Sequence, residues 1–150
     1  MIVVSGCVLI CGMHKDYIRA NKWSEQTIGA AIEVHRHKGP GLLEDIYEKC
    51  LMREFELRGI PAVNQVFVPL EYKGVTLDRA LRLDAIVDSC LIVEIKAVEC
   101  VLPVHKAQLL SYMKLMDVPV GLLINFHVRL LKDGISRLVL RGADLEEVDF

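Results

Sequence analysis

The chain has 150 residues, of which 53% are hydrophobic and 25% charged, and its net charge is −2. This length suits one domain with a substantial core, and the composition is that of a globular protein. The slightly acidic balance excludes the broad basic field of a tight, non-specific nucleic-acid binder, although it leaves room for a local basic groove. Five cysteines at irregular spacings form no zinc pattern, and they favour a reduced, cytoplasmic protein over a secreted disulfide scaffold.

The first thirteen residues, Met1 to Met13, are strongly apolar. This run is shorter than the roughly 20 residues that cross a bilayer, and it lacks the positive start of a signal peptide. We therefore expect no membrane association. Residues 1–22 are predicted to form an N-terminal extension, either as an extra strand or as a loosely attached segment. A start codon assigned too early, with Met13 as the true start, is an open alternative.

A helix is predicted from Ser24 to about Lys38. Ser24 is a suitable N-cap, and Trp23 before it can pack on Ile28 as a hydrophobic staple. The sequence Gly39-Pro40-Gly41 ends this helix.

A second helix is predicted over about 42–58, with an apolar stripe on one face. Glu44 and Glu48 lie four residues apart on the flank of this stripe, where most glutamates are simply solvated. Alternating apolar residues then predict a strand over 63–72, and Lys73-Gly74 predicts a turn into a short strand over 75–77.

The most informative stretch is an apolar strand predicted from Leu91 to Val98, which carries Glu94 and Lys96 in its middle. Side chains on a strand alternate between its faces, so these two point the same way while Ile95 points opposite. Burying a charge costs several kcal/mol unless the charge is paired or bound to a metal. An acid and a base on one face indicate a functional site, but an internal ion pair or one wet face would explain them equally well.

The preceding apolar run, 81–87, contains a carboxylate, Asp84. If Asp88-Ser89-Cys90 form the loop of a hairpin, Asp84 lies directly opposite Glu94, with Cβ atoms roughly 4.5–5.5 Å apart. Two carboxylates this close repel each other unless a cation lies between them. A two-residue turn would instead move Asp84 to the other face.

A third helix is predicted from Pro103 to about Met116. His105, Gln108 and Tyr112 fall at i, i+3 and i+7 and form a polar stripe, for which an ordinary solvated face is an alternative explanation.

The C-terminal part of the chain is predicted to be mostly strand. Residues 118–126 are almost entirely apolar and are predicted to form a strand, and a strand over 128–132 is predicted to turn at Asp133-Gly134 into another over 135–140. Residues 143–150 are predicted to be a loose acidic tail. The order of elements predicts an α/β fold (α+β mixed sheet), with a central mixed sheet flanked by helices.

Several of these residues match known motifs. Asp84 followed by Glu94-Ile95-Lys96 resembles the core of the PD-(D/E)XK nuclease superfamily, whose restriction-endonuclease-like fold the predicted elements fit. Gln108-x-x-x-Tyr112 is similar to the Gln-x-x-x-Tyr motif of its RecB-like exonuclease branch. Gly41-x-x-Glu44-x-x-Tyr47 resembles the signature of the GxxExxY proteins, as do residues 105–112 and 121–126. The resemblance covers about 24–139, and residues 23–142 are predicted to form the nuclease-like domain, whereas the N-terminal extension departs from the family pattern.

The resemblance implies hydrolysis of phosphodiester bonds that depends on Mg²⁺, with Mn²⁺ as a substitute. The implied metal ligands are Asp84, Glu94, the carbonyl of Ile95 and Glu44, acting directly or through water, with Glu48 in reserve. Lys96 would position the attacking water, and Gln108 and Tyr112 would orient the ligands and contact the substrate. His105, on the same stripe, is a weaker candidate for a phosphate contact.

The implied partner is nucleic acid, with DNA favoured over RNA, and a homodimer is a candidate assembly because a small domain with little positive charge needs help to build a DNA groove. A catalytically idle nuclease-fold protein that binds nucleic acid or a protein is the alternative. The intact Asp84, Glu94 and Lys96 favour an enzyme, while the acidic balance favours the idle protein. A small-molecule enzyme with a magnesium site is a third, more distant hypothesis.

Overall fold

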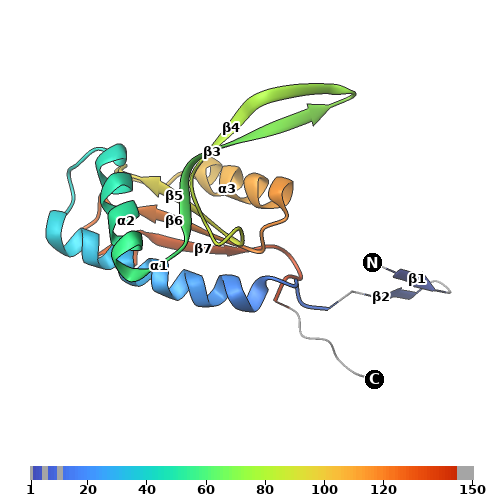
Figure 1. Ribbon diagram of the computed structural model, residues 1–150, viewed down its shortest axis with the longest axis horizontal. Coiled ribbons are helices and arrows are strands. Elements are labelled where there is room, and N and C mark those ends of the chain that lie inside the picture. The colour runs from blue at the N-terminus through green and yellow to red at the C-terminus, as the bar shows by residue number, and fades with distance from the viewer. Residues whose placement is uncertain (1, 5–6, 10–11, 145–150) are drawn as a thin grey trace.

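The computed structural model describes residues 2–4, 7–9 and 12–144 (Figure 1). Two short strands, β1 (Ile2–Val4) and β2 (Cys7–Leu9), pair with each other. The remaining elements are α1 (Tyr17–Lys38), α2 (Glu44–Arg58), β3 (Ala62–Tyr72), β4 (Val75–Val87), β5 (Leu91–Lys96), α3 (Pro103–Met116), β6 (Val120–Asn125), the 3₁₀-helix η1 (Leu131–Gly134) and β7 (Ile135–Val139). None of the described helices combines the length and apolar character needed to cross a membrane.

Five of the strands form one mixed sheet in the order β3-β4-β5-β6-β7. Strands β5 and β6 are parallel, and all other neighbours are antiparallel. The parallel pair lies at the centre, and its residues are buried almost without exception, as expected for strands covered on both faces. The predicted α/β fold with a central mixed sheet is therefore confirmed.

Helices cover both faces of this sheet (Figure 1). Helices α1 and α2 pack on one face through a cluster that includes Ala31, Tyr47 and Phe55. Helix α3 packs on the other face through Leu109, Tyr112 and Met113, which meet Leu83, Ile92 and Leu123. Ile92 and Glu94 are two residues apart on β5, so their side chains lie on the same face of the sheet, which is the face that α3 covers.

Helix α3 comes unusually close to strand β6 at Gly121. A Cβ atom added there would lie 2.6 Å from Met113 Sδ and 3.0 Å from Leu109 Cδ1. A glycine at this position therefore sets the distance between the helix and the sheet, and with it the height at which Tyr112 sits over β5.

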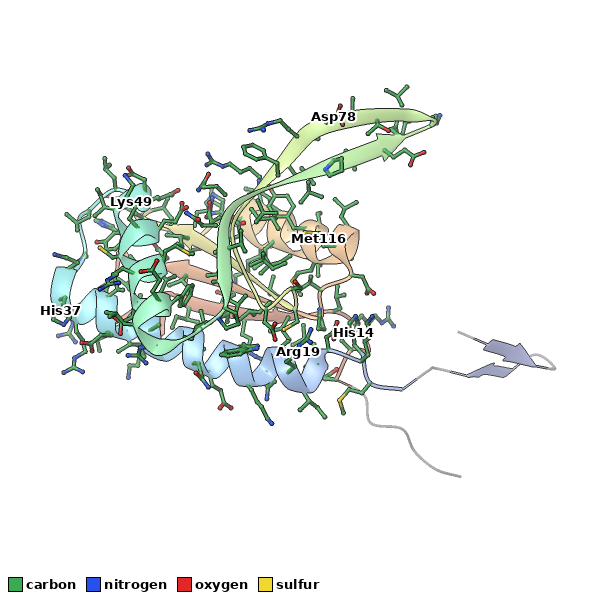
Figure 2. The ribbon with its side chains drawn as sticks, in the orientation of Figure 1. His14, Arg19, His37, Lys49, Asp78 and Met116 are labelled. Carbon is green, nitrogen blue, oxygen red and sulfur yellow. The ribbon has the colours of Figure 1, made fainter. Side chains whose placement is uncertain are left out.

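Strands β3 and β4 extend beyond the sheet as a two-stranded arm (Figure 1). The pairing of β4 with β5 ends at Ala85, whereas its pairing with β3 continues to Val75. Asp78 lies on this arm, clear of the body formed by the sheet and helices (Figure 2). The short strand expected over 75–77 is therefore wrong in extent, because a bulge rather than a break separates it from 81–87.

The predicted start of the first helix was also wrong. Helix α1 begins at Tyr17, and Ser24 is buried inside it, where its hydroxyl donates to the carbonyl of Asn21. Trp23 forms no staple at a helix start; its Nε1 donates to Asp88 Oδ2 at 2.9 Å. Apolar packing extended the helix past a good cap, since Ala20 is fully buried in the core.

The strand predicted over 128–132, with its Asp-Gly hairpin, was wrong as well. Residues 131–134 form the 3₁₀-helix η1, and Leu131 is buried in the core. Gly134 lies against the carbonyl of Asn125, where a side chain would clash. Most of the predicted acidic tail lies outside the described residues, but the carbonyl of Ala143 accepts a hydrogen bond from the N–H of His14.

Candidate active site

Asp84 and Glu94 lie opposite each other on neighbouring strands, as predicted. The ladder between β4 and β5 begins with Val87 opposite Leu91, which is the register of a three-residue loop, 88–90. Asp88 and Ser89 take left-handed φ values of 46° and 56°, which close this loop tightly. The length of the loop therefore decides which carboxylates meet.

The two carboxylates replace the backbone ladder where β4 leaves β5. The N–H of Asp84 donates to Glu94 Oε1 at 3.2 Å, and the N–H of Ile95 donates to Asp84 Oδ2 at 2.8 Å. Each side chain thus satisfies a backbone donor that the diverging strands would otherwise leave unpaired. Both carboxylates are held rigidly in this way.

The environment disfavours two negative charges at this point. Glu94 is only 6% exposed, and burial, followed by the nearby charge of Asp84, raises the pKa of Glu94 to about 8. Burial also raises the pKa of Asp84, although its hydrogen bond with the N–H of Ile95 works in the opposite direction. Burial and mutual repulsion therefore disfavour full ionisation of the metal-free pair.

Lys96 lies two residues after Glu94, on the same face of β5 and at its half-buried end. Its charge lowers the pKa of Glu94, but this effect is smaller than those of burial and Asp84. Within the described residues, Lys96 forms no ion pair with a carboxylate within 4.0 Å. The ammonium group is therefore available to a ligand at the end of the strand.

Helix α2 forms the opposite wall of a cleft of about 410 Å³ beside Asp84. The cleft is lined by Glu44, Asp45, Glu48, Lys49, Asn64, Gln65, Arg82, Asp84 and Ile95. Glu44 is the first residue of α2, and its Oε1 accepts a hydrogen bond from the N–H of Ala97, just past the end of β5, at 3.3 Å. The structure therefore brings Glu44 to the same cleft as Asp84.

The Gly41-x-x-Glu44-x-x-Tyr47 motif has a structural explanation. Gly41 has a φ of 104°, which a side chain rarely tolerates. The hydroxyl of Tyr47 donates to the carbonyl of Gly39 at 2.5 Å and accepts from the N–H of Leu42 at 3.2 Å. Glycine thus allows the turn and tyrosine fixes it, so that Glu44 is aimed at the cleft.

Glu48, the reserve ligand, is engaged by strand β3. Its carboxylate accepts hydrogen bonds from Asn64 Nδ2 at 3.0 Å and from Gln65 Nε2 at 2.6 and 2.7 Å. Gln65 has a left-handed φ of 52°, so the backbone departs from regular strand at this contact. Glu44, which accepts one hydrogen bond, is freer to accept a ligand than Glu48.

The polar residues predicted on α3 approach the site from the face of the sheet opposite to α1 and α2. Tyr112 is buried, and its pKa is raised by burial and by the nearby charge of Glu94, against a hydrogen bond with Gln108. Tyr112 therefore lies near the carboxylate pair, and the exposed Gln108 is linked to the pair through Tyr112. His105 has a different role, because its Nδ1 accepts a hydrogen bond from the N–H of Leu102 at 3.0 Å and caps the helix.

Two residues of this region escaped the sequence analysis. Asn125, at the end of β6, is opposite Lys96, and its side chain bonds both backbone groups of Val98. It thereby fixes the segment that follows β5. Arg82 lines the cleft two residues before Asp84. A polar residue ending an apolar strand was a usable signal for Asn125; nothing in the sequence distinguished Arg82.

The donor set suits a hard divalent cation. Within the described residues, no group of three or more His, Cys, Asp or Glu side chains is gathered closely enough to hold a metal. Asp84 and Glu94 nevertheless form a close pair of carboxylates whose pKa values are both raised, with Glu44 across the cleft from Asp84. Mg²⁺ is bound by one or two carboxylates and keeps several waters, so this sparse set fits it.

Comparison with known proteins places the chain in a family. The model of the PD-(D/E)XK nuclease superfamily matches residues 21–138, and this range includes all the residues of the candidate active site. The solved structure of SSO0001 is 22% identical with a TM-score of 0.46, and the match covers 87% of this chain and 63% of that one. Among curated proteins, none matches this chain. The chain belongs to the PD-(D/E)XK nuclease superfamily, whose nucleases usually use divalent metal ions.

Proposed function

We propose that this protein is a metal-dependent nuclease that hydrolyses phosphodiester bonds in nucleic acid, and that Mg²⁺ is its metal. The observation that carries the proposal is the interlocked pair Asp84 and Glu94, with Lys96 two residues further along the same strand. Asp84 lines an open cleft, and among the described residues none of the three forms an ion pair within 4.0 Å. We further infer that the chain is a GxxExxY protein with the Gln-x-x-x-Tyr motif of the RecB-like branch.

In this proposal Asp84, Glu94 and the carbonyl of Ile95 hold the metal, and Glu44 contributes from α2, directly or through water. A bound divalent cation lowers the pKa of water and polarises a phosphoryl oxygen. Lys96 orients the attacking water and stabilises the negative charge that grows on the phosphate. Gln108 and Tyr112 hold Glu94 in position and contact the substrate backbone.

The electrostatics of the pair support this assignment. A buried carboxylate pair is costly in the absence of a cation, because burial and mutual repulsion both act against ionisation. Apart from Lys96 and Asn125 at the strand ends, the rest of β5 and β6 is apolar, so packing alone gives no reason for these side chains. A bound dication would offset both costs.

The test is a cleavage assay on labelled single- and double-stranded DNA and RNA, with Mg²⁺, Mn²⁺ or EDTA. Cleavage is expected with either metal, to be absent with EDTA, and to be lost in Lys96→Ala and Asp84→Ala. Lys106→Ala is the matched control, because it removes an exposed lysine from the first turns of α3. Cleavage that persists in Lys96→Ala would contradict the proposal.

The alternative, a catalytically idle protein that binds nucleic acid, predicts a different pattern. The folded protein would bind labelled DNA or RNA and cleave none of the four substrates with either metal. The acidic wall formed by Glu44, Asp45 and Glu48 is the structural feature that favours it.

A further inference from the structure

Phe67, Arg79 and Arg82 form a patch, here called the arginine patch, at the base of the arm. Arg82 pairs with Phe67 across the two strands and also lines the cleft that contains Asp84. Arg82 and Asp84 are two residues apart on β4, so their side chains leave the strand on the same face about 7 Å apart. The patch therefore begins beside the proposed catalytic carboxylate.

A bulge brings Arg79 to this face. Arg79 and Arg82 are three residues apart, and in a regular strand their side chains would point to opposite faces. The pairing shifts between Val68 and Leu70, so that Pro69 alone faces three residues of β4, 78–80. Arg79 itself has a left-handed φ of 54°. Bulges of this kind re-aim side chains beside functional sites, and proline is tolerated there because it has no N–H to pair.

The aromatic ring of Phe67 holds Arg79 in place. The Arg79 guanidinium carbon lies 3.6 Å from the centre of the ring, which is the distance of a stacked cation–π contact. A stacked guanidinium keeps its N–H edge free, and this planar fork matches two oxygens of a phosphate. The stacking contact favours this orientation before any ligand arrives.

Neither arginine is neutralised by the part of the chain that the structure describes. No carboxylate lies within 4.0 Å of either guanidinium among the described residues. This is unexpected for Arg82, because three acidic side chains lie across the same cleft. Glu48 is held instead by Asn64 and Gln65, which leaves both arginines available.

We propose that the arginine patch binds the phosphodiester backbone of the nucleic acid next to the bond that is cut. This inference rests on the proposed function and adds the surface that holds the substrate. It also gives a chain with a net charge of −2 a local site for a polyanion, because two arginines without a carboxylate partner among the described residues lie on one strand near Asp84. The opposite, acidic wall then repels the backbone and confines it to the arm.

The test is equilibrium binding of the full chain to labelled single- and double-stranded DNA in EDTA, followed by fluorescence anisotropy at several salt concentrations. Arg79→Gln and Arg82→Gln are each expected to weaken binding about 10-fold and to reduce the slope of log K against log salt by about one. Arg82→Lys keeps the positive charge but loses the planar pair of guanidinium N–H donors, so we expect a loss of affinity smaller than that of Arg82→Gln. Circular dichroism checks that each variant is folded.

Arg53→Gln is the matched control, because it removes one positive charge from an exposed residue of α2 that is paired with Glu56. It is expected to bind within twofold of wild type. The inference is overturned if both patch variants bind like wild type, if Arg53→Gln weakens binding equally, or if the wild-type chain binds no nucleic acid. Binding that depends on the patch without metal-dependent cleavage would instead support backbone binding by the patch and contradict the nuclease proposal.

Discussion

Asp84 and Glu94 each accept the hydrogen bond of a backbone N–H from the other's strand, at the point where β4 separates from β5. Asp84 accepts from Ile95, the neighbour of Glu94, and Glu94 accepts from Asp84 itself. The start of the arm and the carboxylate pair are therefore one structural feature, because the departing strand frees the donors that position both side chains.

Divalent metal is expected to stabilise the protein, because a cation relieves the repulsion within this pair. If millimolar Mg²⁺ or Mn²⁺ is about 100 times its Kd, the free energy of unfolding rises by about 2.7 kcal/mol. For a chain of this size that is a rise in Tm of roughly 5–10 °C. A thermal melt with metal and with EDTA measures it, and an unchanged Tm would contradict a metal site here.

Glu94→Gln tests the same repulsion within the carboxylate pair without adding metal. It removes one of the two repelling charges while keeping the shape, so at pH 8 the metal-free variant is expected to be at least as stable as wild type. It should also lose most of the rise in Tm that metal causes. A variant that is less stable than wild type in EDTA but still responds fully to metal would contradict this explanation.

The raised pKa of Glu94, about 8 against an ordinary value of 4.5, fixes the direction of a pH effect. Between these values the carboxyl is protonated in the folded protein and ionised in the unfolded chain, so folding binds a proton. The contribution of this group to the stability of the metal-free protein therefore falls as pH rises through this window.

Metal affinity should change in the opposite direction, rising as pH approaches 8, since a cation must displace the proton of Glu94. Titration calorimetry at pH 7 in two buffers of different ionisation enthalpy would detect the released proton. No difference between the buffers would mean that the pair is already ionised.

The carboxylate register could be predicted from the sequence because it depends on local features. A three-residue loop between two apolar runs determines which residues face each other, and Asp84 and Glu94 follow from that count. Glu44 and Tyr112 could be placed only through the resemblance, because the helix-to-sheet packing that brings them to the site involves contacts distant in sequence.

Other features could not be predicted because a long-range interaction overrode a local signal. Ser24 has good capping chemistry, but burial of Ala20 extends the helix beyond it. Asp133-Gly134 is typical of a hairpin, but Leu131 enters the core and draws the segment into a 3₁₀-helix. Arg79 shares a face with Arg82 only because of a bulge, which spacing along the sequence cannot reveal.

Lys96→Ala is expected to lower the cleavage rate by about 10²–10⁴-fold, since one positioned group supplies the orientation of the water and part of the charge stabilisation. The melting temperature should change little, because Lys96 is half-buried and forms no ion pair within the described part of the chain. Single-turnover cleavage at saturating enzyme measures the chemical step. A loss that disappears at higher enzyme concentration would assign Lys96 to binding instead.

Tyr47→Phe tests whether the turn before α2 positions Glu44. The variant keeps the ring, which stacks on Phe126 at 4.4 Å, but loses the hydroxyl that bonds Gly39 and Leu42. We expect a loss of stability of about 1–2 kcal/mol and a 10- to 100-fold slower cleavage through displacement of Glu44. Tyr72→Phe, on the exposed arm, is the control and should change neither. Tyr47→Phe with normal activity would show that Glu44 does not depend on this turn.

Gly121→Ala tests how closely α3 must pack on β6. The added Cβ would lie 2.6 Å from Met113 Sδ, so the helix or the methionine must shift, and overpacking of this kind costs about 1–3 kcal/mol. Tm should fall by roughly 2–12 °C. Gly29→Ala is a control of opposite sign, because it lies within α1 and its Cβ meets only the flexible end of Arg58 at 3.3 Å. That change should stabilise the helix by up to about 1 kcal/mol.

Because Tyr112 shifts with α3, Gly121→Ala should also slow cleavage, whereas Gly29→Ala should not. If both variants cleave at the same rate, cleavage does not depend on the exact position of α3.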